Sequence, residues 1–327
     1  MSGLDVLWLT PEKPENISVG RERISRYVEA AGHTVELRGS TLQTAITSFG
    51  DGDEFDVIVG TTRLGAVIAT AVGTVHDIPV VVDHVDPIRQ LRETDGRALA
   101  AVVERFENLV FRLADHVVYV YPEETARVES RASAWSRTNL GVDYDRFSTP
   151  SDAIVDSARA NLGSLSSDVA IYVGGLEPMY EIEAMLDSVA YLDDWTLLVA
   201  GAGSLEPAVE AAAATSDTIQ FLGVVPHEHI PGYLRLADVG IALVDDPHTL
   251  KVLEYGAAGL PFVQLAGHAE SRFGGLAEYT STEPREVAAA IERAGAADTG
   301  TALQRYIGQF DWERIARTYV RVITTVK

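Results

Sequence analysis

The sequence predicts an α/β protein built from two doubly wound parallel sheets with helices on both faces. Short runs rich in valine, isoleucine and leucine alternate with helix-length stretches along most of the chain. Each run is apolar at successive positions, as a strand must be when both faces of its sheet are covered. The alternation restarts after a polar stretch at 148–152, so we expect two lobes with ligand bound in the cleft between them.

The first lobe is expected to contain five strands. The first, 5–10, leads into a loop with Pro11, Pro14 and Gly20 and then an amphipathic helix that ends near Gly32. Further short β-branched runs are at 35–37, 57–59, 80–82 and 117–120. Helix-length stretches separate them, as in an open doubly wound sheet.

The second lobe repeats the pattern. We predict strands at 169–173, 196–199, 219–222 and 239–244, and helices that begin near Met179, Leu205, Pro226 and Thr249. The stretch 310–316 begins a final helix that could return to the first lobe. The predicted domains are therefore 1–148 together with the closing helix 312–327, and 149–311.

Acidic residues dominate the charge of this chain. It has 327 residues, with 48 Asp and Glu against 26 Lys and Arg, a formal net charge of -22, and 46% hydrophobic residues. The apolar fraction argues against a disordered acidic protein and favours a globular protein from a salt-rich cytoplasm. Such a surface also argues against nucleic acid as a partner.

The sequence excludes several kinds of chemistry. It has no cysteine, which rules out disulfides, thiolate zinc sites and cysteine nucleophiles. No apolar run approaches the roughly 20 residues that a membrane span needs, and no signal-peptide pattern opens the chain. We therefore expect a cytoplasmic protein that touches a membrane at most peripherally.

Lys251 is the first candidate site residue. It is one of only three lysines, with Lys13 and Lys327, and it precedes Glu254 and a glycine-rich stretch. A chain that uses arginine elsewhere has an ammonium group here, which suggests an anion-binding site.

The residues before Lys251 predict a helix start. Asp246 followed by Pro247 forms a natural N-cap and N1 pair. Lys251 would then lie in the opening turns, where backbone N–H groups bind anions, with Glu254 on nearly the same face. An alternative is that Asp246 is only a cap and that Lys251 and Glu254 form only an i,i+3 pair.

The order of several motifs resembles the C-terminal lobe of family 4 glycosyltransferases, here in a compact, haloarchaeal-like form. The motifs are Val173-Gly174-Gly175-Leu176-Glu177, Ala200-Gly201-Ala202-Gly203, Phe221-Leu222-Gly223-Val224-Val225, Ala237-Asp238-Val239 and 251–261. Stretches 139–147 and 310–316 are similar to the family's linker segment and closing helix. The resemblance covers nearly the whole chain but is strong only in the second lobe.

This resemblance implies two Rossmann-like lobes, the GT-B fold, and transfer of a sugar from a UDP- or GDP-linked donor. The acceptor would be a glycan or polyprenyl-linked hydroxyl, with retention of configuration and no metal or other cofactor. The family's signature is two acids separated by seven residues, one contacting the sugar and one the ribose; here these are Asp246 and Glu254. The predicted donor-binding set comprises Lys251, Glu254, Asp246, Gly174, Gly175, Gly201, Gly203, Thr249 and Leu250.

The chain departs from the family at two positions. Where the family usually has an arginine and a lysine on the diphosphate, this sequence has Gly175 and Tyr180. We expect Lys251 to be the principal cation instead, with backbone N–H groups of the glycine turns approaching the phosphates. The alternative is a degenerate donor site.

In the first lobe the predicted reacting position is the end of the fourth strand, because ligands of open α/β sheets bind at strand carboxyl ends. Asp86 or His84 could orient or deprotonate an acceptor hydroxyl, and with Glu254 they form the catalytic set. Alternatively, Asp83 and Asp86 cap the next turn and His84 is partly exposed. The predicted acceptor-side residues are Asn16, Ser18, Gly20 and Arg89.

Two further features have ordinary structural interpretations. Arginines 89, 92, 97, 105 and 112 surround a helix with apolar residues Leu99, Val102, Val103, Phe106, Leu109, Val110 and Leu113. We favour a core-facing helix with solvated arginines over a surface for a lipid headgroup. His227 and His229 lack the spacing of a metal site, so they are interpreted as a helix start.

Three function classes remain. A glycosyltransferase is favoured; a nucleotide-sugar epimerase of the same fold and a non-catalytic sugar- or nucleotide-binding subunit are the alternatives. The epimerase pattern of paired glutamates beside a glycine-rich turn is not found in this sequence.

Overall fold

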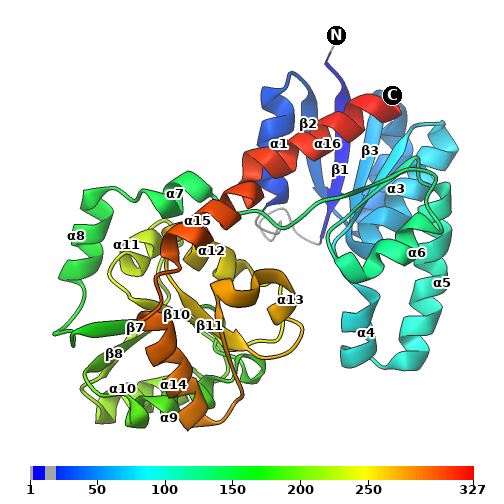
Figure 1. The fold of residues 1–327 in the computed structure, drawn as a ribbon. Helices are drawn as coiled ribbons and strands as arrows, with labels where there is room; N and C mark the ends of the chain where they lie inside the picture. Colours follow the sequence, from blue (N-terminus) through cyan, green and yellow to red (C-terminus); the bar gives the residue numbers. More distant parts are fainter. Residues whose placement is uncertain (1–2, 12–19) are drawn as a thin grey trace. The chain divides into compact units, whose positions relative to one another are not determined.

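The computed structural model describes residues 3–11 and 20–327. The chain forms two compact units: unit 1 is Met1–Gly141 with Trp312–Lys327, and unit 2 is Val142–Asp311 (Figure 1). Each unit holds one six-stranded, all-parallel sheet with helices on both faces. The predicted fold class is therefore confirmed.

The sheet of unit 1 has the strand order β2-β1-β3-β4-β5-β6. Its strands are β1 (Asp5–Thr10), β2 (Thr34–Gly39), β3 (Val57–Thr61), β4 (Val80–His84), β5 (His116–Tyr119) and β6 (Trp135–Arg137). Its α-helices are α1 (Arg21–Ala30), α2 (Leu42–Asp51), α3 (Thr62–His76), α4 (Ile88–Thr94), α5 (Arg97–Leu113), α6 (Thr125–Glu129) and α16 (Trp312–Val326).

Successive side chains of β1 point to opposite faces of the sheet, so this strand contributes to the hydrophobic core on both faces. Val6 and Trp8 pack with α1 and α16, whereas Leu7 and Leu9 pack with α3 and α5 on the opposite face. The closing helix α16 runs along α1 in Figure 1. Trp312, its first residue, belongs to the hydrophobic core that these two helices form with the sheet. All four β1 side chains are fully buried, as the parallel-sheet pattern requires.

A buried polar network joins the last helix to β4. The Asp83 carboxylate accepts hydrogen bonds from Arg21 Nε at 2.8 Å, Thr61 Oγ1 at 2.8 Å and Tyr319 Oη at 2.7 Å. The side chain of Asp83 is fully buried and that of Arg21 is 5% exposed. Asp83 is therefore a strand residue that holds α1 and α16 on the sheet, and the interpretation of it as a turn cap is wrong.

Unit 2 contains the second sheet, in the order β12-β11-β10-β7-β8-β9. Its strands are β7 (Asp168–Val173), β8 (Trp195–Ala200), β9 (Ile219–Gly223), β10 (Val239–Ala242), β11 (Phe262–Leu265) and β12 (Glu278–Thr280). Its α-helices are α7 (Tyr144–Ser148), α8 (Asp152–Ala160), α9 (Ile182–Ser188), α10 (Glu206–Thr215), α11 (Ile230–Leu234), α12 (Leu250–Ala258), α13 (Glu270–Phe273), α14 (Pro284–Gly295) and α15 (Gly300–Ile307).

The strand order of unit 2 defines where a ligand is expected. The chain proceeds from β7 outward to β8 and β9, and then returns to β10 on the other side of β7. Ligands of open α/β sheets bind beyond the carboxyl ends of the strands, at such a reversal. Helix α12, which carries Lys251, follows β10 and therefore begins beside the end of β7.

The structure differs from the sequence prediction in three strands and one boundary. The short strands β6, β11 and β12 were not predicted, and they lie at or towards sheet edges. The division between the units falls after Gly141 rather than after residue 148. The reason is that α7 packs against α12 and thus belongs to unit 2.

Helix α5 is not simply the core-facing helix that we favoured. Ala100, Glu107, Val110 and Phe111 are buried, but another set of apolar side chains on this helix is exposed to solvent. The exposed set is Leu99, Val102, Phe106, Leu109 and Leu113, each at least 48% exposed. Their spacing of three and four residues places them along one stripe, so α5 is apolar on two faces.

This stripe is part of a wider apolar surface on α2, α3 and α5. Of the 17 exposed large hydrophobic residues among those described, 11 lie on these three helices. They are Leu42, Ile46, Phe49, Leu64, Val67, Val75 and the five residues of α5. We call this set the apolar face of unit 1. In the described part of the chain, no helix is long and apolar enough to span a membrane.

Candidate functional site

A cavity of about 270 Å³ lies in unit 2 at the carboxyl ends of β7, β8 and β9. Three of the predicted glycines, Gly174, Gly175 and Gly201, line it together with His227. The cavity therefore lies at the sheet end where ligands of open α/β sheets bind, and its wall is built largely from glycine backbone.

Two of these glycines are required by the backbone itself. Gly174 has φ of 154° and Gly201 has φ of 145°, and a Cβ on Gly201 would come within 1.8 Å of the Gly174 carbonyl oxygen. Their N–H groups bind Ala200 O at 3.0 Å and Gly223 O at 2.8 Å. These two amides are thus engaged within the protein, and the expectation that they face a phosphate is wrong. Gly203 does not line the cavity and packs beside Leu176.

Lys251, the second residue of α12, is held by two tyrosines. Its side chain is almost buried, with the residue 9% exposed, and Nζ donates to Tyr172 Oη at 3.1 Å. Nζ also lies 4.3 Å from the centre of the Tyr172 ring and 4.1 Å from that of Tyr180. In the described part of the chain, no carboxylate lies within 4.0 Å of this ammonium group. Lys251 therefore has aromatic rings and a phenol where a buried cation usually has an acid.

The position of Lys251 connects it to the cavity. It does not line the cavity itself, but a Cβ on Gly174 would come within 2.8 Å of Nζ. Tyr172 Oη accepts from Lys251 and donates to the carbonyl of Gly175 at 2.5 Å. The ammonium therefore lies directly behind two of the glycines that form the cavity wall.

Burial changes the acidity of Lys251. Loss of water around the ammonium group lowers its pKa to about 7, although the negative charge of Glu254 opposes this shift. Near neutral pH the side chain is consequently balanced between its charged and neutral forms. An anion placed beside Nζ would favour the charged form.

The start of α12 differs from the prediction. The N-cap is Thr249, which makes no side-chain cap bond, and the helix begins at Leu250. Asp246 Oδ1 instead accepts from the His248 N–H at 2.8 Å, a turn in which an aspartate binds backbone two residues ahead. The prediction of Asp246 and Pro247 as N-cap and N1 is wrong because this turn delays the helix.

Glu254 is linked to the cavity by His227, which the sequence analysis interpreted only as part of a helix start. Its Oε1 lies 2.7 Å from His227 Nε2, and His227 lines the cavity. The ring of His227 also meets Phe147 edge-on, with centroids 5.7 Å apart. His227 is not part of a helix start, because α11 begins only at Ile230. A pair separated by 27 residues has no local spacing pattern that could have revealed it.

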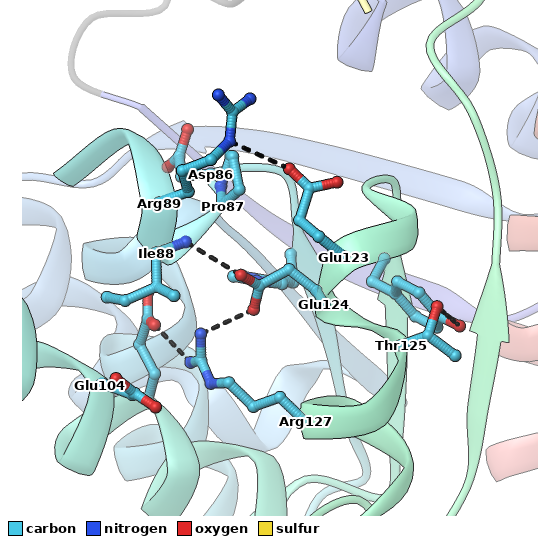
Figure 2. Close-up of polar contacts among 12 residues, drawn as sticks. Asp86, Pro87, Ile88, Arg89, Glu104, Glu123, Glu124, Thr125 and Arg127 are labelled. Carbon is cyan, nitrogen blue, oxygen red and sulfur yellow. Dashed lines mark hydrogen bonds and ion pairs between the residues drawn. The ribbon is translucent and has the colours of Figure 1, made fainter. Parts of the chain in front are cut away.

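In unit 1, His84 belongs to a buried cluster around Glu124. Figure 2 shows Glu124 with two other members of this cluster, Ile88 and Arg127. Glu124 accepts from His84 Nε2 at 3.2 Å, from the Ile88 N–H at 3.0 Å and from Arg127 Nη1 at 2.7 Å. Burial alone would raise the pKa of Glu124, but the hydrogen bond and charge of His84, the charge of Arg127 and the Ile88 amide together lower it. His84 is 5% exposed, so the interpretation of a partly exposed histidine is wrong.

Asp86 and Arg89 lie just beyond β4, at the start of α4. Asp86 Oδ2 is 4.0 Å from Arg63 Nη1, and Arg63 Nη2 donates to the Asp86 carbonyl at 3.0 Å. Arg89 Nε lies 3.5 Å from Glu123 Oε1. Figure 2 shows these two side chains pointing toward one another. Both predicted side chains therefore already have protein partners in this structure.

Of the remaining predicted acceptor-side residues, the structure describes only Gly20. Gly20 is described and precedes α1, with φ of 126° and no room for a Cβ because Trp312 lies 2.5 Å from that position. Its role in the structure is close packing against α16. Asn16 and Ser18 lie outside the described residues.

Unit 1 also has a cavity, of about 280 Å³, between the end of β4 and helices α3 and α5. Aliphatic and aromatic side chains such as Leu64, Val103 and Phe106 line most of it. His84 lines it as well, as do Arg63 and Glu107. It therefore combines an apolar wall with a histidine that is oriented by a buried carboxylate.

Among the described residues, no group of three or more His, Asp or Glu side chains is arranged to hold a metal ion.

Comparison with protein families finds a match to the part of the chain that carries the cavity of unit 2. Residues 167–296 match the family model described as glycosyl transferases group 1. The match lies wholly within unit 2 and contains β7 to β12 together with α12. A comparison of the sequence with curated proteins found no match.

Solved structures share the fold over the whole chain. HepE from Anabaena in complex with UDP superposes with a TM-score of 0.77 at 16% identity, covering 99% of this chain and 100% of that one. Sucrose-phosphate synthase from Thermosynechococcus elongatus gives 0.75 at 16% identity, covering 99% of each chain. A glycosyltransferase from Rickettsia africae gives 0.78 at 11% identity, covering 100% of this chain and 99% of that one. The fold is thus the two-lobed GT-B architecture.

Proposed function

We propose that this protein is a glycosyltransferase that takes a sugar from a nucleotide-activated donor held in unit 2. The observation that carries the proposal is Lys251. Among the described residues, no carboxylate lies within 4.0 Å of this nearly buried ammonium, which lies behind the glycines of a cavity at the carboxyl end of a parallel sheet. An anionic ligand would supply the missing charge partner.

The comparisons support the donor class. The family match covers the segment with this cavity, and the HepE structures of the same fold contain UDP, UDP with glucose, or UDP-glucose. We therefore propose a UDP- or GDP-linked hexose as donor. The diphosphate would lie beside Lys251, and Glu254 would bind the ribose next to His227.

Other parts of the proposal rest on the residues and the resemblance. We propose a metal-independent reaction with retention of configuration, because Lys251 can neutralise phosphate charge without an ion. Asp246 would contact the sugar after its turn with His248 rearranges. The excess of acidic residues favours activity at high salt.

Transfer by a Glu254→Gln variant tests the enzymatic function. We expect transfer to an acceptor to fall about 10- to 100-fold, because the amide cannot replace a charged hydrogen-bond acceptor. Product formation from UDP- and GDP-sugars with polyprenyl-linked and glycan acceptors would be measured at multimolar KCl. Glu210→Gln, an exposed change in α10, is the matched control and should keep wild-type transfer.

The same assay separates the other function classes. Conversion of the donor sugar without acceptor would identify an epimerase. Nucleotide binding without turnover under any condition would identify a binding subunit. Either result would overturn the proposal of a transferase.

For the acceptor we propose a polyprenyl-linked sugar that is used at the cytoplasmic face of a membrane. The apolar face of unit 1 and the apolar cavity beneath it support this, because soluble proteins seldom expose such extended apolar surface. Exposed Arg105 and Arg112 follow the α5 stripe on one side and could meet anionic headgroups. His84 would face the acceptor from the cavity wall.

Vesicle binding tests this membrane contact. Co-sedimentation with vesicles of anionic phospholipid should be at least about tenfold weaker for the double variant Phe106→Asp, Leu109→Asp, because two apolar groups are lost from the contact. Tyr27→Asp changes an exposed ring on α1, which packs on the opposite face of the sheet, and should bind as wild type does. Equal binding by wild type and the double variant would exclude the apolar face as the contact.

A further inference from the structure

We propose that Tyr172 and Tyr180 are positioning residues that hold the Lys251 ammonium against the cavity of unit 2, ready for the diphosphate of the donor. This inference rests on the proposed function, and it names how that site is built. The two rings come from separate segments: Tyr172 from β7 and Tyr180 from the 3-10 turn Pro178–Tyr180 that precedes α9.

The geometry restricts Lys251 on several sides. Its Nζ lies 4.3 Å and 4.1 Å from the two ring centres, within the range of a cation–π contact. Tyr172 Oη adds a hydrogen bond at 3.1 Å, and its own hydrogen is directed to Gly175 O. A flexible lysine side chain is consequently fixed in one place before any ligand arrives.

Gly174 completes this arrangement. Its hypothetical Cβ would lie 2.8 Å from Nζ and 3.2 Å from Tyr172 Oη, so any other residue there would displace the ammonium. Gly174 therefore lines the cavity and also leaves room for the Lys251 ammonium group. A ligand oxygen in the cavity next to Gly174 would thus lie close to Nζ.

Burial between the two rings disfavours the charged form of Lys251, and the negative charge of Glu254 opposes this effect. A carboxylate partner would keep the ammonium charged but would compete with a diphosphate for it. Aromatic rings hold the cation more weakly than a carboxylate does, and they keep water away from it. The titratable groups that surround Lys251 are Tyr172, Tyr180, Tyr255 and Glu254, the last of which is paired with His227. Burial raises the pKa of Tyr172 and Tyr255, so both stay neutral at pH 7 to 9.

Lysine-selective 13C NMR tests the arrangement directly, because the chain has only three lysines. In the wild type we expect the Cε signal of Lys251 to show ring-current shifts and to titrate near pH 7, whereas an exposed lysine titrates near about 10.4. In Tyr180→Ala we expect the ring-current shift to shrink and the midpoint to rise, because water reaches Nζ. Tyr180→Phe should restore both, since it keeps the ring.

Nucleotide affinity is measured in parallel by calorimetry with UDP and GDP. Tyr180→Ala should bind the preferred nucleotide about tenfold more weakly, and Tyr180→Phe should recover most of that loss. If wild type binds and Tyr180→Ala matches it in affinity, chemical shift and titration, the positioning role is wrong but the donor site stands. If wild type binds neither nucleotide, the proposed function fails, and the positioning role fails with it.

Discussion

Lys251→Met is expected to weaken binding of the donor nucleoside diphosphate about 100-fold at pH 7. An ammonium about 4 Å from a phosphate oxygen contributes roughly 4 kcal/mol at an effective dielectric of 20, and part of this is offset by the cost of charging a buried lysine. Methionine keeps the apolar stem against Tyr172 and Tyr180, so the site should retain its shape. Calorimetric titration with UDP and GDP measures the loss.

The pH dependence of the same binding identifies Lys251 more specifically. Its pKa in the free protein is lowered to about 7, so below pH 7 the ammonium is already charged and above pH 7 it must take up a proton when the anion binds. Affinity should therefore fall up to about tenfold for each pH unit from pH 7 to pH 9. The terminal phosphate has a pKa near about 6 and is ionised throughout this range.

Two variants serve as controls for this dependence. Lys251→Met should show weak binding that does not change between pH 7 and pH 9. His227→Gln should keep the wild-type slope, because it alters the neighbour of Glu254 and not the lysine. A wild-type slope in Lys251→Met would show that another group carries the dependence and would refute this assignment.

Asp83→Ala is expected to lower the free energy of unfolding by about 3 to 5 kcal/mol. The change leaves Arg21 as an unpaired charge inside unit 1 and removes the acceptor for Thr61 and Tyr319. Urea unfolding, followed by tryptophan fluorescence, measures the loss. Glu22→Ala removes an exposed ion pair with Arg26 on the same helix and should cost less than about 0.5 kcal/mol.

A double variant distinguishes the cost of an unpaired buried charge from the cost of lost packing. Arg21→Met with Asp83→Leu removes both charges, so it should be less destabilised than Asp83→Ala alone. A loss below about 1 kcal/mol for Asp83→Ala would mean that the network does not hold α1 and α16 on the sheet.

The sequence predicted most of this fold because its central strands are continuous apolar runs. Val80 to Val82 and the alternating residues of β1 are buried on both sheet faces as expected. Short edge strands such as Trp135–Arg137 lack this signal because they carry polar residues and bury less surface. The apolar stripe of α5 was visible in the sequence, but periodicity alone cannot tell which face meets the core.

Residues of the candidate site could be predicted only where the residue type or the local sequence pattern itself indicates a role. The rarity of lysine pointed to Lys251, and turn glycines pointed to Gly174 and Gly201. The contact of Lys251 with two tyrosines could not be predicted. Tyr180 was noted only as a replacement for the family's lysine, and Tyr172 precedes Lys251 by 79 residues and acts through packing. Asp246 was misassigned because an aspartate can begin a helix or a turn with the same sequence pattern.

A structure of the complex with UDP or GDP tests the central claim most directly. We predict a diphosphate in the cavity of unit 2, with one phosphate oxygen about 2.8 Å from Lys251 Nζ, as for other charge-assisted hydrogen bonds. A nucleotide bound elsewhere, with Nζ still between Tyr172 and Tyr180 and no phosphate beside it, would contradict the account.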